Sequence, residues 1–389
     1  MKKLLFYSHD SYGLGNIRRM VAIANFLVAR HHDLYILLVT GSPMLHAFRT
    51  HPQIDYIKLP CLQRSQSGSY SAKLSCFSGQ SLLELRADII HEVVDSFKPD
   101  LVLVDKKPEG LNGELKQTLS LLNTLEPAPK CVLLLRDILD TPQVTQRIWQ
   151  KNQYYQLIEK HYHQVLVVGE QRIFDVVEQY SFPPTVKNMT TFCGYLYRTE
   201  PIEHRIELLD HMLESDKKLI VVAAGGGNDG LLMLENYLQA CRQNSWHHRV
   251  NSMVFYGPEM CQADVEQLKQ IAQQVPNVTL SEFTPHFISY LAAADLVVTM
   301  AGYNTVCEIL SVKKPAIVVP RVSPVAEQLI RAEQFSKLEI FDFIHPHEIT
   351  PSLLNSKIIS KLFCEEARLP FSQHVDLCGM EQLERQLLE

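Results

Sequence analysis

Residues 300–309, MAGYNTVCEI, decide the fold, because the sequence predicts a buried strand that passes there directly into a helix. The preceding residues 293–299, AADLVVT, are short, apolar and β-branched, which predicts the strand. A small-residue turn follows at Gly302, and either Asn304 or Thr305 is placed to cap the helix. A strand, a tight turn and a helix in this order are typical of an open parallel sheet.

This junction predicts an anion-binding site. The first backbone N–H groups of a helix lack partners within the helix, and the positive end of the helix dipole lies at the same place. Glu308 follows about one turn into the helix, so we expect its carboxylate near the same pocket, where it could accept two hydroxyls of a ribose. The alternative at this point is an ordinary capped strand–helix junction without a ligand.

The composition is that of a globular protein with more than one domain. A chain of 389 residues exceeds one ordinary core and suits two α/β domains. The formal net charge of −6 gives no reason to expect nucleic acid. Nine cysteines without a C-x-x-C spacing, and no signal peptide, predict reduced thiols in a cytoplasmic protein. No stretch reaches the roughly 18 apolar residues of a membrane span, but peripheral contact with the inner membrane face stays open.

The first half of the chain alternates strands and helices. An apolar strand at 3–8 leads into the loop HDSYGLGN at 9–16, which contains Gly15, and then into an amphipathic helix at 17–30. This is a common opening of a doubly wound domain, although the third glycine of the dinucleotide fingerprint is missing. Further strands are predicted at 34–40, 54–59, 101–105, 131–135 and 164–168.

Charged side chains stand at the carboxyl ends of these strands, where open parallel sheets place their sites. The candidate rim consists of His9, Asp10, Asp105 and Asp137. Each of them singly is more often a turn or cap residue than a catalyst. Arg18 and Arg19 lie in the first turn of the following helix, where the dipole disfavours cations. An anionic ligand, a nearby carboxylate or plain solvation would explain that placement.

The second half repeats the alternation. A strand at 218–224 runs into GGGNDG at 225–230 and a helix at 231–241, and four glycines in six residues let the backbone approach a bound group closely. Residues 61–80 are rich in Ser and Gly without periodicity, which predicts a lid or binding loop without regular structure, or else a disordered segment. The predicted organisation is a first domain at 1–196, a linker at 197–216, a second domain at 217–370 and a helical tail at 371–389.

The C-terminal half resembles GT-B glycosyltransferases in the order of its motifs. These are the GGG loop, Glu282-Phe283, G-x-N-T-x-x-E at 302–308 and Glu327-Gln328. Among characterised enzymes, this half resembles the peptidoglycan UDP-N-acetylglucosamine transferase. Over nearly the whole chain, the sequence is similar to a group of predicted bacterial glycosyltransferases with the signatures YSHDSYGLGNIRR, LLLRDILD, AAGGGNDG, MAGYNTVCEIL and PRVSPVAEQLIRA. The resemblance implies two Rossmann-like domains that face a cleft.

The resemblance also assigns donor-site roles by position. Arg198 matches an arginine near the domain junction that reaches the donor, and Phe283 with Thr284 matches the segment whose main chain reads uracil. Glu308 matches the ribose carboxylate. The glycine loop facing the diphosphate corresponds to Gly226, Gly227 and Asn228. The phosphate-binding helix N-terminus corresponds to Gly302 and Thr305, and the pair contacting the sugar hydroxyls to Glu327 and Gln328. Gly15, in the first glycine loop, is predicted with this donor-binding set.

The resemblance implies transfer of a hexosyl group, N-acetylglucosaminyl among the candidates, from a UDP-sugar to an unknown glycan, lipid-linked or small-molecule acceptor. Helix N-termini and glycine N–H groups can stabilise the leaving diphosphate without a metal. No D-x-D motif is present, so we predict no metal and no cofactor besides the donor. The peptidoglycan enzyme has a histidine where this chain has Asn16, which cannot be a base. His9 or Asp10 is therefore the predicted catalytic base, the other orienting it.

Two other functions fit the same sequence. A GT-B-fold UDP-sugar epimerase or hydrolase would share the donor site but would use water or no acceptor. A non-catalytic sugar-nucleotide-binding partner of a larger complex would explain Asn16 in place of the histidine. Product analysis with the nucleotide sugar alone separates the first of these from a transferase.

Overall fold

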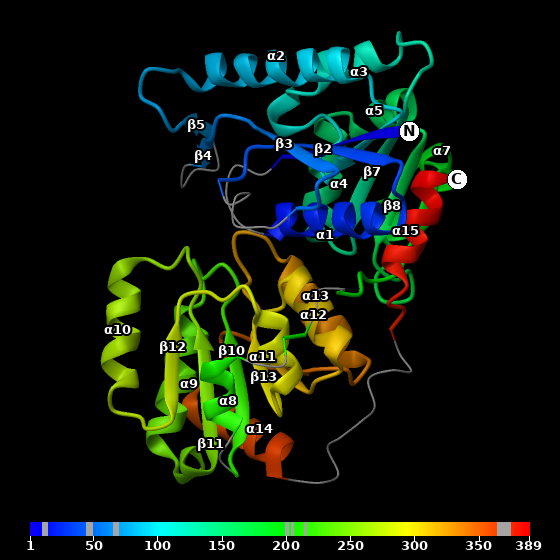
Figure 1. Ribbon diagram of the computed structural model, residues 1–389. Helices are drawn as coiled ribbons and strands as arrows, with labels where there is room; N and C mark the ends of the chain where they lie inside the picture. Colours follow the sequence, from blue (N-terminus) through cyan, green and yellow to red (C-terminus); the bar gives the residue numbers. More distant parts are fainter. Residues whose placement is uncertain are drawn as a thin grey trace. The chain divides into compact units, whose positions relative to one another are not determined.

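The computed structural model describes residues 1–9, 15–43, 50–64, 70–198, 202–203, 206–213, 216–363 and 375–389. These residues group into two compact units (Figure 1). The first contains Met1–Leu196 and Cys378–Glu389, and the second contains Tyr197–Leu377. This grouping differs from the sequence-based division at the linker 197–216, which falls in the second unit, and at the tail 371–389, which is split between the two.

The first unit is built on a parallel sheet with the strand order β3-β2-β1-β6-β7-β8-β9. Its strands are β1 (Lys2–Ser8), β2 (Leu34–Thr40), β3 (Ile54–Lys58), β6 (Leu101–Asp105), β7 (Lys130–Arg136), β8 (Gln164–Val168) and β9 (Thr190–Phe192). The central strands β6, β7 and β8 are near-continuous apolar runs and are buried, as expected for a parallel sheet covered on both faces. The described helices of this unit are α1 (Gly15–Arg30), α2 (Gly79–Phe97), α3 (Lys116–Leu122), α4 (Pro142–Lys151), α5 (Tyr154–His161), α6 (Val176–Gln179), α7 (Pro184–Asn188) and α15 (Gly379–Leu388), with a 3₁₀ turn at Leu111–Gly113.

The segment 61–80, predicted as a loop without structure, contains ordered elements. Two short antiparallel strands, β4 (Leu62–Arg64) and β5 (Tyr70–Ala72), pair with each other. Helix α2 then begins at Gly79, where Ser78 and Ser81 form a reciprocal capping box. Sequence periodicity missed the strands because three residues are too few to show an alternation.

The C-terminal helix α15 belongs to the first unit because its apolar face is buried there. Met380, Leu383 and Leu387 lie on that face, and the helix packs beside α1 (red and dark blue in Figure 1). Glu384 accepts hydrogen bonds from Arg30 and His31 at the end of α1. A helical pattern alone shows which face is apolar but does not show which domain covers it.

The second unit is also a parallel sheet, with the order β12-β11-β10-β13-β14-β15. Its strands are β10 (Lys218–Ala223), β11 (Val250–Phe255), β12 (Val278–Ser281), β13 (Leu296–Thr299), β14 (Ala316–Val318) and β15 (Asp342–Phe343). Its described helices are α8 (Glu207–Leu213), α9 (Leu231–Gln243), α10 (Gln262–Ala272), α11 (Phe287–Ala293), α12 (Tyr303–Val312), α13 (Glu327–Lys337) and α14 (Pro351–Phe363), with a 3₁₀ segment at Ser245–Arg249.

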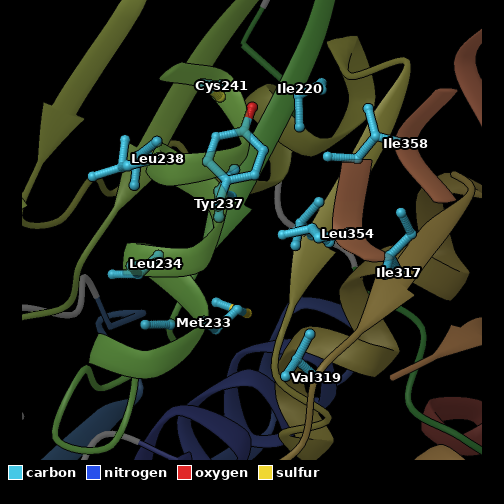
Figure 2. Packing of buried hydrophobic residues seen from close by; sticks show 14 of the residues in the cluster. Ile220, Met233, Leu234, Tyr237, Leu238, Cys241, Ile317, Val319, Leu354 and Ile358 are labelled. Atoms are coloured by element: carbon cyan, nitrogen blue, oxygen red, sulfur yellow. The ribbon is translucent and has the colours of Figure 1, made fainter. Parts of the chain in front are cut away.

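One face of this second sheet carries the main core of the unit. Alternate residues of the central strands, such as Ile220 and Ile317, point toward α9 and α14 (Figure 2). Leu234 and Tyr237 of α9 and Leu354 of α14 close over them. On the opposite face, α11 packs against α12. No helix in the described part of the chain combines the length and apolar character that a membrane crossing requires.

Candidate functional site

The winding direction of the second sheet reverses between β10 and β13. From β10 the chain moves outward to β11 and β12, and it then returns to pair β13 with the other side of β10. Open α/β sheets bind ligands outside the carboxyl ends of the strands at such a reversal. The loops that leave β10 and β13 are the glycine loop at 225–230 and the turn at Gly302, so the structure places both predicted anion-binding segments at this point.

The glycine loop needs glycine because it packs against a neighbouring turn. Gly225 and Gly227 have φ values of +67° and +98°, which side chains rarely adopt. A Cβ atom on Gly227 would lie 2.2 Å from the carbonyl oxygen of Tyr256. The Glu259 N–H donates to the Gly226 carbonyl at 2.8 Å, which fixes the loop on the turn after β11. The Glu259 carboxylate therefore lies beside Gly226, a neighbour that the sequence pattern did not indicate.

The N-terminus of α12 differs from the predicted one in where it begins. The helix starts at Tyr303 with Gly302 as its N-cap and no side-chain capping bond. Asn304 and Thr305, predicted as caps, lie inside the first turn instead. The hydrogen-bond ladder of the helix begins with Val306 N–H to Gly302 O at 3.0 Å, so the N–H groups of the first turn stand outside that ladder. The predicted anion site thus begins at Gly302.

A third loop, which follows β14, reaches the same place. The Gln328 amide nitrogen would lie 4.0 Å from a Cβ atom on Gly302, and the Gln328 side-chain oxygen accepts the Arg321 backbone N–H at 3.2 Å. The Arg321 guanidinium contacts Asp229 of the glycine loop at 3.2 Å and Glu327 at 3.1 Å. The structure therefore brings the glycine loop, Gly302 and the Glu327-Gln328 pair together. Sequence reasoning missed Arg321, although its place just after a buried strand is the signal used for the other rim residues.

Phe283 and Thr284 lie one strand further along the same edge. The Gly257 N–H donates to Glu282 O at 3.0 Å, which continues the β11–β12 pairing beyond the strand ends. Phe283 is 45% exposed, and the Thr284 hydroxyl accepts the His286 N–H at 3.2 Å. The segment thus presents an aromatic ring and a polar main chain beside the turn that holds the glycine loop.

For Arg198 and Glu308, two predicted donor residues, the described contacts do not lead to the glycine loop or to Gly302. The Arg198 N–H donates to the Ser311 hydroxyl at 3.0 Å, in the last turn of α12. That end is about 12 Å along the helix from its first residue. Glu308 is fully buried, so its carboxylate does not face solvent. The donor roles of Arg198 and Glu308, like those of the other donor residues, stay predictions.

A second candidate site lies in the first unit, again where the winding reverses. There β1 pairs with β2 on one side and with β6 on the other. His9 follows β1, and its Nδ1 lies 3.9 Å from a carboxylate oxygen of Asp105 at the end of β6. Arg19 of α1 donates a hydrogen bond to the other oxygen of Asp105, and both side chains are buried. A nearby carboxylate therefore explains the placement of Arg19. Because α1 begins at Gly15 and not at residue 17, Arg19 lies in the second turn of the helix.

His9 is neutral near pH 7. Burial is the largest cause that lowers the pKa of His9 well below 6.5, and the charges of Lys107, Lys106 and Arg136 lower it further. The side chain is 12% exposed, and because it is uncharged its contact with Asp105 is not an ion pair. A neutral imidazole can accept a proton, which is the state that a general base requires. Asp10, the other predicted base, lies outside the described residues.

The carboxylate of Asp137, the last member of the predicted rim, is hydrogen-bonded to groups of the fold. One of its carboxylate oxygens accepts the Tyr195 hydroxyl at 3.0 Å, and the other accepts the Ile138 N–H at 2.8 Å. The side chain is buried, so it ties the end of β7 to the end of the Met1–Leu196 segment.

The architecture matches solved structures over the whole chain. MurG of Acinetobacter baumannii aligns with a TM-score of 0.62 and 14% identity, covering 100% of this chain and 99% of that chain. A putative UDP-N-acetylglucosamine 2-epimerase from Listeria monocytogenes aligns with a TM-score of 0.65 and 14% identity, covering 98% and 94%. The calicheamicin glycosyltransferase CalG4 aligns with a TM-score of 0.57 and 15% identity, covering 100% of this chain and 94% of that chain. Two doubly wound units of this kind define a protein of the GT-B fold class.

The sequence comparisons are more specific for the second unit. Residues 221–373, which lie within the second unit, match the glycosyltransferase family 28 C-terminal domain. Two curated relatives are the UDP-N-acetylglucosamine--N-acetylmuramyl-(pentapeptide) pyrophosphoryl-undecaprenol N-acetylglucosamine transferases of Clostridium kluyveri and Haemophilus influenzae. The first is 29% identical over 46% of this chain and 50% of its own length, and the second is 24% identical over 45% and 48%. The chain thus spans about half the length of these curated relatives, and over that part it is similar to MurG-like glycosyltransferases.

Two glycine substitutions should separate ligand binding from folding. Gly302 has φ −64° and ψ 137°, which alanine adopts freely, and the nearest atom to an added methyl group is 4.0 Å away. We expect Gly302→Ala to leave the melting temperature unchanged and to weaken UDP binding by about 10-fold or more, because the methyl group occupies space at the helix N-terminus. Gly227→Ala should instead destabilise the second unit by more than about 2 kcal/mol, since it combines a strained φ with a clash. Thermal unfolding and calorimetric titration measure both, and unchanged UDP affinity in Gly302→Ala would exclude a phosphate from this turn.

Proposed function

We propose that this protein transfers a hexosyl group from a uridine nucleotide sugar to an acceptor hydroxyl. The observation that carries the proposal is the convergence of the glycine loop, the uncapped helix N-terminus at Gly302 and the Glu327-Gln328 pair at one winding reversal. Backbone N–H groups and a helix dipole suit a diphosphate, and neighbouring carboxamide and carboxylate groups suit sugar hydroxyls. N-acetylglucosamine is the first sugar to test, because the names of the curated relatives contain it.

The chemistry requires three events. The bond between the anomeric carbon and the diphosphate breaks, a bond to the acceptor oxygen forms, and the acceptor hydroxyl loses its proton. In this proposal the second unit stabilises the diphosphate, and in an inverting transfer His9 of the first unit takes the proton. Helix and backbone dipoles and cationic side chains of the second unit stabilise the leaving diphosphate in this proposal.

The chemical class of the acceptor is to be found by experiment. The curated relatives are named for a lipid-linked, pyrophosphoryl-undecaprenol acceptor. Their similarity to this chain covers less than half of its residues. A lipid-linked glycan is therefore the first acceptor class to test, ahead of soluble glycans and small molecules.

Binding and product analysis test the donor and the reaction separately. Titration of the full chain with UDP, ADP and GDP should show binding to UDP alone; preference for another base would refute the uridine assignment. Incubation with UDP-N-acetylglucosamine alone should leave the nucleotide sugar intact, and addition of an acceptor extract should release UDP. An epimerised sugar in the absence of acceptor would identify an epimerase, and free sugar would identify a hydrolase.

The predicted ribose role of Glu308 has a specific test. If its carboxylate accepts the ribose hydroxyls, the wild-type protein binds UDP more tightly than 2′-deoxy-UDP, and Glu308→Ala removes that preference. Loss of charge-assisted bonds should cost about 1.5–3 kcal/mol each, and Glu308→Gln should lose less. Because Glu308 is fully buried, thermal unfolding must accompany the titrations. A preserved preference for UDP in Glu308→Ala would remove Glu308 from the ribose site.

A further inference from the structure

Arg321 is a cation held between two of the loops that form the candidate donor site. One guanidinium nitrogen contacts Asp229 of the glycine loop at 3.2 Å, and another contacts Glu327 at 3.1 Å. The Arg321 side chain is 27% exposed, Asp229 is 36% exposed and Glu327 is 6% exposed. Within the described part of the chain, the buried Nε–H group of Arg321 has no hydrogen-bond partner. Arg321 thus lies at the winding reversal, where part of its side chain reaches solvent. Its Nε–H group can still donate a hydrogen bond.

The charges around the glycine loop make a cation necessary there. Asp229 belongs to the loop itself, and a Cβ atom on Gly226 would lie 3.0 Å from a carboxylate oxygen of Glu259. A nucleoside diphosphate brings further negative charge into the same place. The N-terminus of α12 supplies only about half a positive charge. Two carboxylates and a diphosphate therefore need a full positive charge nearby, and the Arg321 guanidinium reaches this group of loops.

We propose that Arg321 binds the diphosphate of the donor and exchanges Asp229 for a phosphate oxygen when the donor enters. This proposal rests on the proposed function and adds the residue that neutralises the leaving group. The planar guanidinium presents paired N–H groups that match phosphate oxygens, and a partly exposed ion pair is weak enough to be exchanged. The bond from the Arg321 backbone N–H to Gln328 keeps the residue in place during the exchange. Asp229 acts in this scheme as a competitor for the arginine in the ligand-free protein.

Two substitutions test the exchange, because we expect Arg321→Ala to weaken UDP binding and Asp229→Asn to strengthen it. Titration calorimetry of the full chain would measure affinities for uridine and for UDP. Arg321→Ala should weaken UDP binding by about 10–100-fold and leave uridine binding within about two-fold, because only the phosphate contact is lost. Asp229→Asn should strengthen UDP binding by a few-fold, because it removes the competing charge. Arg321→Lys keeps the charge but loses the fork, so its affinity for UDP should fall between those of wild type and Arg321→Ala.

A matched control and thermal unfolding exclude trivial causes. Arg242 lies in the last turn of α9 and bonds to Gln274, so Arg242→Ala removes the same charge from the same unit and should leave UDP binding unchanged. If Arg321 only holds the two loops together, Arg321→Ala and Asp229→Asn should each weaken the binding of uridine and of UDP to the same extent. That result would overturn the proposal. Wild-type protein that binds neither uridine nor UDP would refute the proposed function itself, a different outcome from selective failure of the arginine.

Discussion

Replacing His9 by alanine should lower turnover by about 10²–10⁴-fold while UDP affinity stays within a few-fold, which is the usual cost of losing a general base. His9 directly follows β1 at the winding reversal of the first sheet, and its Nδ1 lies 3.9 Å from a carboxylate oxygen of Asp105. His32, an exposed histidine of the same unit, provides a control, and His32→Ala should keep wild-type turnover. Near wild-type turnover in His9→Ala would remove His9 from the chemistry.

The pH dependence of the reaction gives a second readout of His9. Burial and three neighbouring cations lower the pKa of His9 well below 6.5, so the imidazole gains its proton only at a pH below that value. The rate constant kcat/KM should therefore stay level from pH 8 down to pH 6.5 and fall only when the pH passes through the lowered pKa. In His9→Ala this acid limb should disappear. An acid limb centred at or above pH 6.5 would contradict a buried, neutral base.

Asp105 is expected to position His9 rather than to take the proton. Arg19 already donates a hydrogen bond to the Asp105 carboxylate, which is fully buried. Asp105→Asn should lower turnover, and the double variant with His9→Ala should be little slower than His9→Ala alone, because the two act as one unit. Asp10→Asn is the corresponding test of the base predicted from sequence outside the described residues. The thermal stability of Asp105→Asn must also be measured, because the substitution removes the negative charge that pairs with the buried Arg19 guanidinium.

Truncating Glu114 to alanine should destabilise the first unit by about 3–5 kcal/mol, because it leaves the fully buried Arg86 without its counter-charge. The Arg86 Nε and Nη2 groups donate to the two carboxylate oxygens of Glu114 at 2.6 and 2.8 Å, and Nη1 donates to Pro60 O at 2.7 Å. Burial raises the pKa of Tyr7 well above 10, and the charge of Glu114 raises it further, so the Tyr7 hydroxyl stays protonated and donates to Glu114.

The measurement can be confined to one unit. The chain has two tryptophans, Trp149 in the first unit and Trp246 in the second, so denaturation of a Trp246→Phe background reports the first unit by fluorescence. The double variant Arg86→Met/Glu114→Leu should lose less stability than Glu114→Ala, because neither charge is then left alone in the interior. A loss below about 1 kcal/mol in Glu114→Ala would show that water or another group replaces the carboxylate.

This buried pair also holds the start of the segment 61–80, which the sequence predicts to be a lid or binding loop. Through Pro60, Arg86 of α2 fixes the chain just before the β4–β5 strands. Leu62 of β4, Leu82 of α2 and Leu111 form a small apolar cluster under the same segment. We therefore expect the pairing of β4 with β5 to open in Glu114→Ala before the main sheet unfolds, which hydrogen exchange on the full chain would detect.

The sequence by itself determined the two sheets and the elements that carry the candidate donor site. Buried parallel strands are continuous apolar runs, and glycine loops and helix periodicity are local signals, so 218–241 and 293–311 could be read as strand, turn and helix. Local signals failed where packing decides. Helix α12 begins at Tyr303, ahead of both predicted capping residues, and the three-residue strands within 61–80 were missed.

Which side chains meet depends on how the strands are ordered in the assembled sheets. Arg321 contacts Asp229 across 92 positions of the chain, and these contacts depend on β10, β13 and β14 lying side by side, which no local pattern specifies. The same holds for His9 and Asp105, which come together because β6 inserts beside β1. The full burial of Glu308 is a property of the packed helix α12 and not of its sequence spacing. Strand order is fixed by the burial of whole faces against one another, so the site that forms where strand ends converge appears only when the sheets are assembled.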